Sequence, residues 1–419
     1  MPRNVFAIGL VSLLNDASSE IIYPLLPIFL ASSLGASARA IGTIEGLAES
    51  ISSLLKLFAG YLSDRLAKRK LLVVAGYSVA SLARPLLAFA QTWTQVLAIR
   101  LTDRIGKGVR TAPRDAMIAD TVRVEQRGLA FGFHRAMDHG GAVIGPLVGY
   151  LLVILFVANA KSPTTSEFSK IFLAASVPAL LAVLVAIFFM RESPVSSASL
   201  EAGASAPLSP RSSTINNKAA SSRRTPKKLS LRGFDSNFKR FLLVLALFTL
   251  SNSSDSFLIL RAMDSGVSVA LVPLLWAAHH GMKVLSSLLG GDLSDRLGRK
   301  RLIVAGWILY AAVYAGFAFA THQASLWILF LVYGIYFGLA EGAEKALVAD
   351  LVRPEQRGTA YGLYNLAFGV TVFPASFLMG MIWDWKGPTT AFLVSAFMGA
   401  TAAMLLLILV RPRPERIIE

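Results

Sequence analysis

The sequence predicts an all-α membrane protein with twelve transmembrane helices in two six-helix halves, and three observations support this. The composition is apolar: 54% of the 419 residues are hydrophobic, only 16% are charged, and the mean hydropathy is +0.59. Long apolar runs recur, such as RFLLVLALFTLSNSSDSFLIL and TTAFLVSAFMGATAAMLLLILV. Each is close to the roughly 20 residues that a helix needs to cross a bilayer. Two motifs also recur at an almost constant spacing, which indicates an internal duplication.

The apolar segments divide the chain into twelve expected spans. In the first half they are predicted at about 5–31, 39–62, 71–91, 94–118, 128–156 and 168–191. In the second half they are predicted at about 240–263, 267–293, 301–321, 325–352, 358–383 and 388–410. Between them, residues 192–239 are rich in Ser, Ala, Pro and basic residues and are predicted to form a disordered linker. The predicted domains are therefore 1–191 and 240–410, with 411–419 as a tail.

The distribution of charge predicts the orientation in the membrane. The net charge is +16, and Lys and Arg concentrate at 64–70, at 295–301, in the linker and in the tail. This positive-inside pattern predicts a multi-pass protein of the inner (plasma) membrane with both termini in the cytoplasm, and it argues against a nucleic-acid partner. The first apolar segment has full spanning length and no small-residue cleavage site, so no cleavable signal peptide is expected. The absence of cysteine excludes disulfides and thiolate metal sites.

The duplication is visible in two pairs of motifs. GYLSDRLAKRK at 60–70 returns as GDLSDRLGRKR at 291–301, and ADTVRVEQRGLAFG at 119–132 returns as ADLVRPEQRGTAYG at 349–362. The offsets are 231 and 230 residues, so the register is kept across each half. A direct repeat with an even number of spans predicts two bundles related by a pseudo-two-fold axis along the membrane normal.

Six charged residues stand close together in DRIGKGVRTAPRD, residues 103–115. The repeat aligns this stretch with YGIYFGLAEGAEK at 333–345, so it is expected in the fourth span and not in a loop. Charges facing lipid would cost about 3 kcal/mol each, so they must face the interior of the bundle. Helical spacing puts four of them on one stripe: Asp103, Lys107, Arg110 and Arg114. Together with Arg104, they are expected to line a cavity or to form interior ion pairs.

The first two spans contain carboxylates, whose charge is opposite to that of these cations. Asp16 and Glu20 lie at i and i+4 in the first span, and Glu45 and Glu49 lie in the second, with Lys56 further along the same face. Burial favours the protonated form of a carboxylate, whereas a nearby cation favours the ionised form. Competition between a proton and a solute at such a group would couple their movements. Glu20, Glu45 and Glu49 are therefore the candidate proton carriers, and Asp16 is either a further one or a polar helix contact.

The fifth span adds His134, Arg135, Asp138 and His139. Arg135 and Asp138 are spaced to pair with each other, which is the alternative to a role in the cavity. Histidine titrates near neutral pH, so His134 is a candidate member of a proton relay. No metal site and no cofactor are expected.

The two signature loops resemble those of the major facilitator superfamily, over the whole chain except the linker. The family pattern Gly-x-x-x-Asp-Arg-x-Gly-Arg-Arg between helices 2 and 3 is matched, apart from Ala67 in place of the usual Gly, by Gly60, Asp64, Arg65, Lys68 and Arg69. The second copy is matched by Gly291, Asp295, Arg296, Gly298 and Arg299. The resemblance implies transport by alternating access, with the fourth helix lining a central cavity. It also implies a latch between the signature-loop Asp and a basic residue of the fourth helix.

For this latch the resemblance implies Arg114 with Asp64, and Lys345 with Asp295 in the second half. Contact with substrate is the alternative for Arg114.

The fifth span also resembles a motif of proton-coupled antiporters, Gly-x8-Gly-x3-Gly-Pro-x2-Gly-Gly. The matching residues are Gly132, Gly141, Gly145, Pro146 and Gly149, and Tyr150 replaces the last Gly. The alternative is ordinary close packing of helices through small residues. The resemblance favours export over import.

These observations together favour a secondary transporter. The expected activity is proton-coupled efflux (antiport) of a small charged or zwitterionic organic solute, energised by the proton gradient. No enzyme signature is present, and RIGKGVR lacks the spacing of a phosphate-binding loop. The expected partners are the solute, protons and lipid, and the protein is expected to be a monomer. The fourth-span string DRxGKGxRxxPRDA resembles a subgroup of bacterial and archaeal superfamily members and does not identify the substrate. Two alternatives stay open: proton symport uptake of an organic anion, and a non-transporting membrane sensor or assembly partner.

Overall fold

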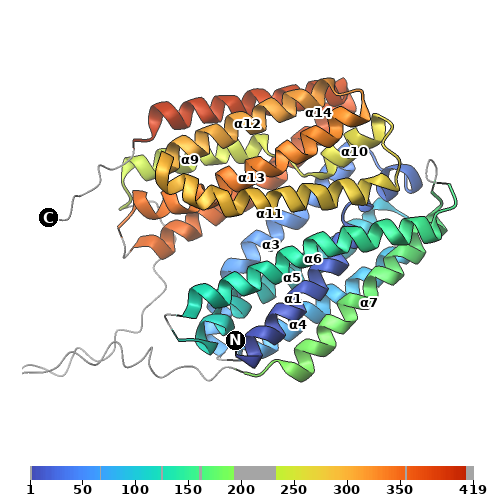
Figure 1. The fold of residues 1–419 in the computed structure, drawn as a ribbon, viewed down its shortest axis with the longest axis horizontal. Coiled ribbons are helices and arrows are strands. Elements are labelled where there is room, and N and C mark those ends of the chain that lie inside the picture. The colour runs from blue at the N-terminus through green and yellow to red at the C-terminus, as the bar shows by residue number, and fades with distance from the viewer. Residues whose placement is uncertain are drawn as a thin grey trace, which may run out of the picture.

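The structure is a computed structural model that describes residues 2–66, 68–123, 126–159, 163–192, 233–353 and 356–411. Every regular element in these ranges is helical. The helices of residues 2–192, here called the first half, lie on one side of the molecule, and those of residues 233–411, the second half, lie on the other (Figure 1). The predicted linker at 192–239 and the predicted tail at 411–419 fall almost entirely outside the described residues.

The first half contains nine helical elements within the described residues: α1 (Arg3–Ile22), α2 (Leu26–Ile28), the π-helical turn η1 (Phe29–Ser33), α3 (Ala38–Leu66), α4 (Arg69–Ala83), η2 (Arg84–Phe89), α5 (Trp93–Thr121), α6 (Arg127–Phe156) and α7 (Thr165–Phe189). The second half contains α9 (Ser236–Ser251), α10 (Ser256–Asp264), α11 (Leu271–Leu297), α12 (Arg299–Phe319), α13 (Gln323–Leu351) and α14 (Arg357–Leu409). The chain folds back within α14 at Gly387, where φ is 84° and ψ is 169°. A residue with a Cβ would be strained in this conformation.

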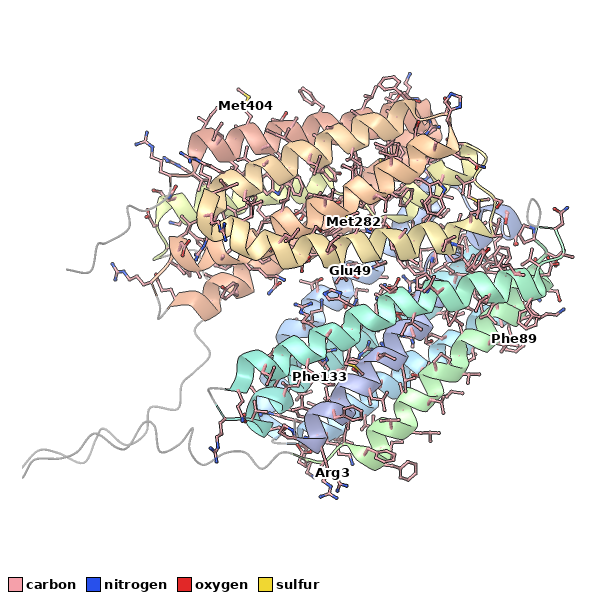
Figure 2. All side chains as sticks on the ribbon, in the orientation of Figure 1. Arg3, Glu49, Phe89, Phe133, Met282 and Met404 are labelled. Atoms are coloured by element: carbon pink, nitrogen blue, oxygen red, sulfur yellow. The ribbon has the colours of Figure 1, made fainter. Side chains whose placement is uncertain are left out.

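Eight helical segments of the described chain are long and apolar enough to cross a membrane. The helices α3, α5 and α11 are not among them, although they contain 29, 29 and 27 residues. At about 1.5 Å per residue such lengths suffice to cross a bilayer. Large apolar side chains such as Phe89 and Met404 are exposed on the outer surface, where a lipid-facing protein needs them (Figure 2).

The span predicted at about 240–263 matches the candidate membrane span Ser236–Asp264, but the helix within it is unwound between α9 and α10. Asn252 has φ −92° and ψ 84°, outside the helical region. The backbone N–H of Ser256 donates to the hydroxyl of Ser254, and the N–H of Ser254 donates to the hydroxyl of Ser376. Hydroxyl side chains compete with the helical backbone for its hydrogen bonds, so this serine-rich stretch leaves the helix despite its apolar flanks. The predicted span at 5–31 is likewise interrupted, by a turn at residues 23–25.

The helix pairs repeat between the halves. In the first half α5 packs against α3 and α4, and α1 packs against α6; in the second half α13 packs against α11 and α12, and α9 against α14. The halves meet mainly through α3 with α14 and α6 with α11. In the antiporter-like motif, a Cβ at Gly145 would lie 2.5 Å from the carbonyl oxygen of Ala17 on α1. Helix packing therefore requires this glycine, whatever else the motif does.

At the same end of each half, equivalent contacts join the start of the first helix to a residue just after the last helix. The Asn4 side-chain amide donates to the carbonyl of Arg191 (3.1 Å) and its Oδ1 accepts the N–H of Arg191 (3.0 Å). Asn237 makes the same reciprocal contact with Arg411, whose N–H lies 2.9 Å from Oδ1. We call this end of the molecule, where α1 and α9 begin, the linker end, and the opposite end the far end.

Candidate functional site: a charged cavity between the halves

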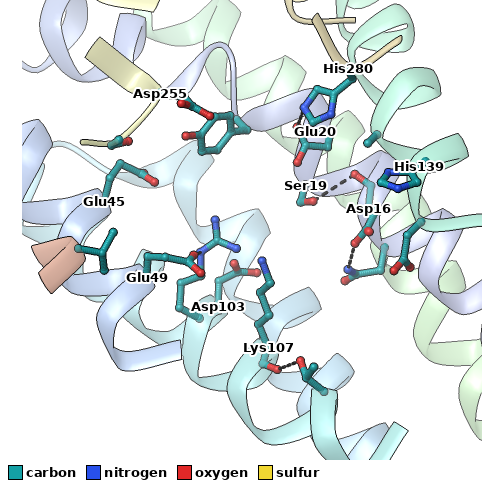
Figure 3. Close-up of a pocket in the computed structure, with 18 of the residues that line it drawn as sticks. Asp16, Ser19, Glu20, Glu45, Glu49, Asp103, Lys107, His139, Asp255 and His280 are labelled. Atoms are coloured by element: carbon teal, nitrogen blue, oxygen red, sulfur yellow. Dashed lines mark hydrogen bonds and ion pairs between the residues drawn. The ribbon is translucent and has the colours of Figure 1, made fainter. Parts of the chain in front are cut away.

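A cavity of about 530 Å³ lies between the two halves. Its wall is formed by α1, α3, η2, α5 and α6 from the first half, and by the α9–α10 junction, α11, α13 and α14 from the second. The carboxylates on its wall are Asp16, Glu20, Glu45, Glu49, Asp103, Asp138 and Asp255. The cations on its wall are Lys56, Arg84, Arg104, Lys107, Arg110, Arg114, Arg135 and Lys283. Figure 3 shows carboxylates of both halves facing this space, together with Lys107.

The cavity brings together ten of the eleven residues that the sequence predicts for it. These are Asp16, Glu20, Glu45, Glu49, Asp103, Arg104, Lys107, Arg110, Arg135 and Asp138. The eleventh, His134, is buried behind the wall, where Nε2 lies 2.9 Å from the hydroxyl of Ser12 and Nδ1 lies 3.6 Å from Asp138. The alternative pairing of Arg135 with Asp138 is not formed.

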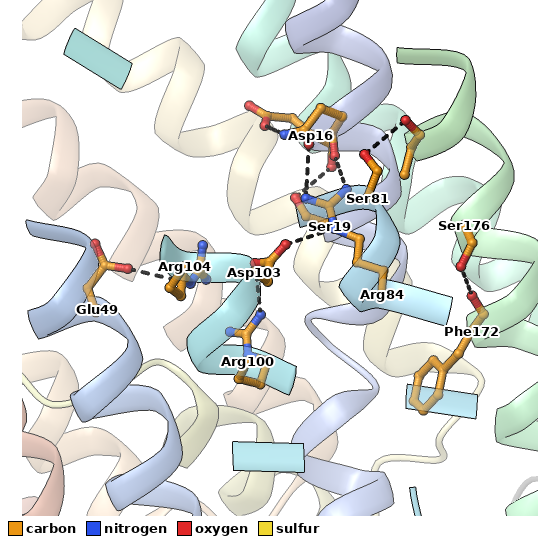
Figure 4. Close-up of polar contacts among 12 residues, drawn as sticks. Asp16, Ser19, Glu49, Ser81, Arg84, Arg100, Asp103, Arg104, Phe172 and Ser176 are labelled. Carbon is orange, nitrogen blue, oxygen red and sulfur yellow. Dashed lines mark hydrogen bonds and ion pairs between the residues drawn. The ribbon is translucent and has the colours of Figure 1, made fainter. Parts of the chain in front are cut away.

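Two buried ion pairs fix the far-end side of the wall, Arg100 with Glu45 and Arg84 with Asp103, and Figure 4 shows the second of them. Arg100 donates to both oxygens of Glu45, at 3.0 and 2.7 Å, in the fork geometry that suits a guanidinium and a carboxylate. Arg84 donates to Asp103 at 3.1 Å and makes two further hydrogen bonds to Asn15, at 3.0 Å each. All four charged side chains are no more than 7% exposed. A third and looser pair joins Arg104 to Glu49 at 3.9 Å.

Other cations on the wall form no salt bridge among the described residues. They are Lys56, Lys107, Arg110, Arg135 and Lys283. Arg110 is 4% exposed, its guanidinium lies 4.4 Å from the centre of the Tyr77 ring, and Nε and Nη1 are buried without a hydrogen-bond partner. Lys283 lies 3.9 Å from the centre of the Phe337 ring.

Three carboxylates on the wall contact only neutral groups at hydrogen-bond distance. Glu20 accepts from the indole N–H of Trp276 (2.9 Å), Asp255 from the hydroxyl of Tyr333 (2.7 Å) and Asp16 from the amide of Asn15 (2.9 Å). The contact of Glu20 joins the two halves, because Trp276 is on α11.

The signature loops are only partly described. The side chains of Asp64, Arg65 and Asp295 lie outside the described residues, so both predicted latch pairs stay predictions. Arg114 lines the cavity and donates to Asp115 and to Ser12, and Lys345 pairs with Glu341 on its own helix at 3.0 Å. Arg296 is exposed at the end of α11.

The structure shows a second repeated contact here, which the sequence analysis did not anticipate. Arg69 pairs with Asp120 and Arg299 pairs with Asp350, so the residue that begins α4 or α12 contacts the end of α5 or α13 in each half.

The far end is closed by contacts between α3 and α14. The N–H groups of Ala38 and Arg39, at the start of α3, donate to the two carboxylate oxygens of Asp384, at 3.0 Å each. Further along the same helices, the hydroxyl of Ser50 donates to the carbonyl of Gly369 at 2.5 Å. A Cβ at Gly42 would lie 2.1 Å from the carbonyl oxygen of Ser376. The backbones of the two halves therefore touch between the cavity and the far end.

Several wall and support residues were missed by the sequence analysis. Four of them contact the carboxylates described above: Arg84, Arg100, Trp276 and His280. For Arg84 and Arg100 a signal was present, because Arg84 is a lone Arg in an apolar stretch and Arg100 directly precedes the charged stretch 103–115, and ionisable residues in a membrane span are functional by default. Trp276 and His280 carry no comparable signal.

Comparisons with known proteins agree with this architecture. The family model described as Major Facilitator Superfamily matches residues 8–343 and 241–418. An uncharacterised MFS-type transporter of Methanocaldococcus jannaschii is 35% identical over 413 residues, which is 97% of this chain and 95% of the relative. A multi-drug resistance efflux pump PmrA homolog of Lactococcus lactis is 25% identical and covers 84% of this chain and 81% of the relative.

Among solved structures, a D-xylose-proton symporter aligns with a TM-score of 0.74 at 15% identity, covering 98% of both chains. A bacterial homolog of the human lysosomal transporter Spinster, in an inward-facing and unoccupied conformation, aligns with a TM-score of 0.69 at 18% identity and covers 98% of this chain and 96% of that one. At such identities the likeness concerns the fold alone.

Proposed function

The chain belongs to the major facilitator superfamily, and from this membership we propose that it is a secondary transporter of a small charged or zwitterionic organic solute. The observation that carries the proposal is the charged cavity between the halves. Four of its charged residues, Arg84, Glu45, Asp103 and Arg110, are buried, and buried charges persist only when paired or functional. A charged solute would supply the partners that the wall lacks.

The proposed architecture is twelve spans in two bundles that rock against each other around the cavity. The repeated helix pairs and the reciprocal contacts of Asn4 and Asn237 support it. In this scheme the contacts between Ala38, Arg39 and Asp384 form in the state closed at the far end and break in the other state. We place the linker end in the cytoplasm and the protein, as a monomer, in the plasma membrane.

Proton coupling is proposed to act through Glu20. This carboxylate faces the cavity, contacts no Lys or Arg, and accepts a hydrogen bond from Trp276 on the opposite half. Loss or gain of its proton would therefore change a contact between the halves. Glu45 is less suited to this role, because both of its oxygens are occupied by Arg100. Glu49, at 3.9 Å from Arg104, stays a second candidate.

The proposed direction is export. The antiporter-like motif in α6 supports it, and so does the relative whose name describes drug efflux, the Lactococcus lactis protein. The surplus of unpaired cations on the wall favours the second candidate, uptake of an organic anion with protons.

Transport is tested with the purified protein in liposomes that contain a pH-sensitive dye, by adding a panel of organic cations, anions and zwitterions. We expect proton movement on addition of one class of solute. We expect Glu20→Gln to abolish it, because the amide still accepts the Trp276 N–H but neither takes up nor releases a proton. With the solute added outside, loss of luminal protons would identify antiport, and gain of luminal protons would identify symport.

The matched control is Asp264→Asn, which removes an exposed carboxylate outside the cavity. It should transport like the unaltered protein. If Glu20→Gln transports protons and solute as well as this control does, Glu20 is not the proton carrier. If no solute of any class moves protons, the proton-coupled proposal is wrong.

A further inference from the structure

We propose that the cavity selects a zwitterion, with Lys107 and Arg110 holding its anionic group and Glu20 and Asp255 holding its cationic group. This inference rests on the proposed function, because it names the class of solute that the transporter moves. It assigns a binding role to each end of the cavity and an orientation to the solute.

Four of the charged residues that lack an opposite partner lie apart along the cavity: the cations Lys107 and Arg110, and the carboxylates Glu20 and Asp255. The helix α5 runs from the far end to the linker end, and Arg100 and Asp103, which are paired, precede Lys107 and Arg110, which are not. Glu20 lies near the end of α1, and Asp255 is the N-cap residue of α10, which leads to the far end. In Figure 3, Glu20 and Asp255 lie on one side of the cavity and Lys107 reaches into it from the other.

Arg110 has the properties of an anion-binding residue. Its guanidinium lies 4.4 Å from the centre of the Tyr77 ring, and its Nε and Nη1 are buried without a hydrogen-bond partner among the described residues. A buried guanidinium without acceptors is costly, and a carboxylate or phosphate fits its fork of donors. Lys107 is three residues earlier on the same helix face, within reach of the same anion.

Glu20 and Asp255 have the complementary properties. One oxygen of each accepts from a neutral donor, Trp276 or Tyr333, and among the described residues the other oxygen has no hydrogen-bond partner. The nearest basic group to Glu20 is Nε2 of His280 at 3.7 Å, which is beyond hydrogen-bond distance. The ring of Tyr23, which also lines the cavity, lies 5.2 Å from that of Trp276, so aromatic faces accompany the two carboxylates.

A solute with a single charge would satisfy only one end of this cavity. An organic anion at Arg110 would leave Glu20 and Asp255 without a cation, and an organic cation would leave Arg110 without an acceptor. The three ion pairs between these ends already neutralise Glu45, Glu49 and Asp103. A volume of about 530 Å³ accommodates a small molecule that carries both groups.

The test measures binding without a gradient, by isothermal titration calorimetry on the purified protein at constant pH. The probes are unbranched ω-amino acids of increasing chain length, each compared with the fatty acid and the alkylamine of the same length. At the chain length that binds most tightly, we expect the ω-amino acid to bind at least tenfold more tightly than the fatty acid or the alkylamine. Glu20→Gln should remove this preference over the fatty acid, and Arg110→Gln the preference over the alkylamine. Lys107→Gln should act like Arg110→Gln, and Asp264→Asn should change nothing.

Fatty acids that bind as tightly as the ω-amino acids would overturn the inference in favour of an anion site, and alkylamines that do so would overturn it in favour of a cation site. Absence of binding by every probe to the folded protein would also overturn it. Failure of this inference can be distinguished from failure of the proposed function. If a solute with one charge moves together with protons, the proposed transport function stands and the zwitterion inference is wrong. If the ω-amino acids bind preferentially but no proton movement occurs, the zwitterion inference stands and the proton-coupled function is wrong.

Discussion

Replacing Gly42 with alanine is expected to separate the two halves at the far end. The added Cβ would lie 2.1 Å from the carbonyl oxygen of Ser376, 2.9 Å from its carbonyl carbon and 3.0 Å from the ring of Phe257. The first two atoms belong to the backbone of α14, so no side-chain rotation relieves the clash. Overpacking of this kind costs about 1–3 kcal/mol. Only the state closed at the far end bears this cost, and about 1.4 kcal/mol changes a population ratio tenfold.

The absence of cysteine makes this prediction simple to measure. Spin labels on Arg39→Cys and Trp385→Cys, both exposed and on opposite halves, report the far-end distance by double electron–electron resonance. Gly42→Ala should shift the distribution to longer distances. The control is Gly281→Ala on α11, where a Cβ would meet nothing within 4 Å. Identical distributions in the two variants would show that α3 and α14 do not exchange between a closed and an open contact.

The elements of this fold follow from local sequence signals, and the exceptions have local causes. The duplication correctly places residues 103–115 in a helix, because α5 covers Trp93–Thr121. Apolar length alone would have excluded that stretch, since its charges keep α5 out of the apolar spans. The break between α9 and α10 was missed, because a hydropathy average does not register a short run of serines that capture backbone hydrogen bonds.

The residues that line the cavity are easier to predict from the sequence than the ion pairs that they form. A stripe of charges on one helix face shows which side faces the interior, as it does for Lys107 and Arg110. It does not show which partners meet across helices. Glu45 and Arg100 are 55 residues apart, and the rotation and depth of two helices decide whether they touch. Asp138 illustrates the same limit, because the nearest base is His134 and not the expected Arg135.

Replacing Glu45 with leucine is expected to destabilise the protein strongly. The change leaves the guanidinium of Arg100 6% exposed and without its bidentate partner, since the next carboxylate, Asp103 at 3.9 Å, is already bonded to Arg84. Removing one partner of a buried pair typically costs about 3–5 kcal/mol, because the remaining charge stays desolvated. Thermal unfolding of the purified protein should show this as a markedly lower midpoint. The looser pair supplies a matched comparison: Glu49→Leu should cost less, because Glu49 is 30% exposed and lies 3.9 Å from Arg104.

The double variant Glu45→Leu with Arg100→Met separates a structural role of this pair from a functional one. Replacing both charges by apolar groups of similar size is often neutral, so the unfolding midpoint should recover most of the loss. If solute-driven proton movement also recovers, the pair only holds α3 against α5, and the proton carrier lies elsewhere, at Glu20 in our proposal. If stability recovers and proton movement does not, Glu45 takes part in the transport cycle despite its occupied oxygens. A single variant as stable as the unaltered protein would contradict the pairing itself, because an uncompensated buried guanidinium cannot be without cost.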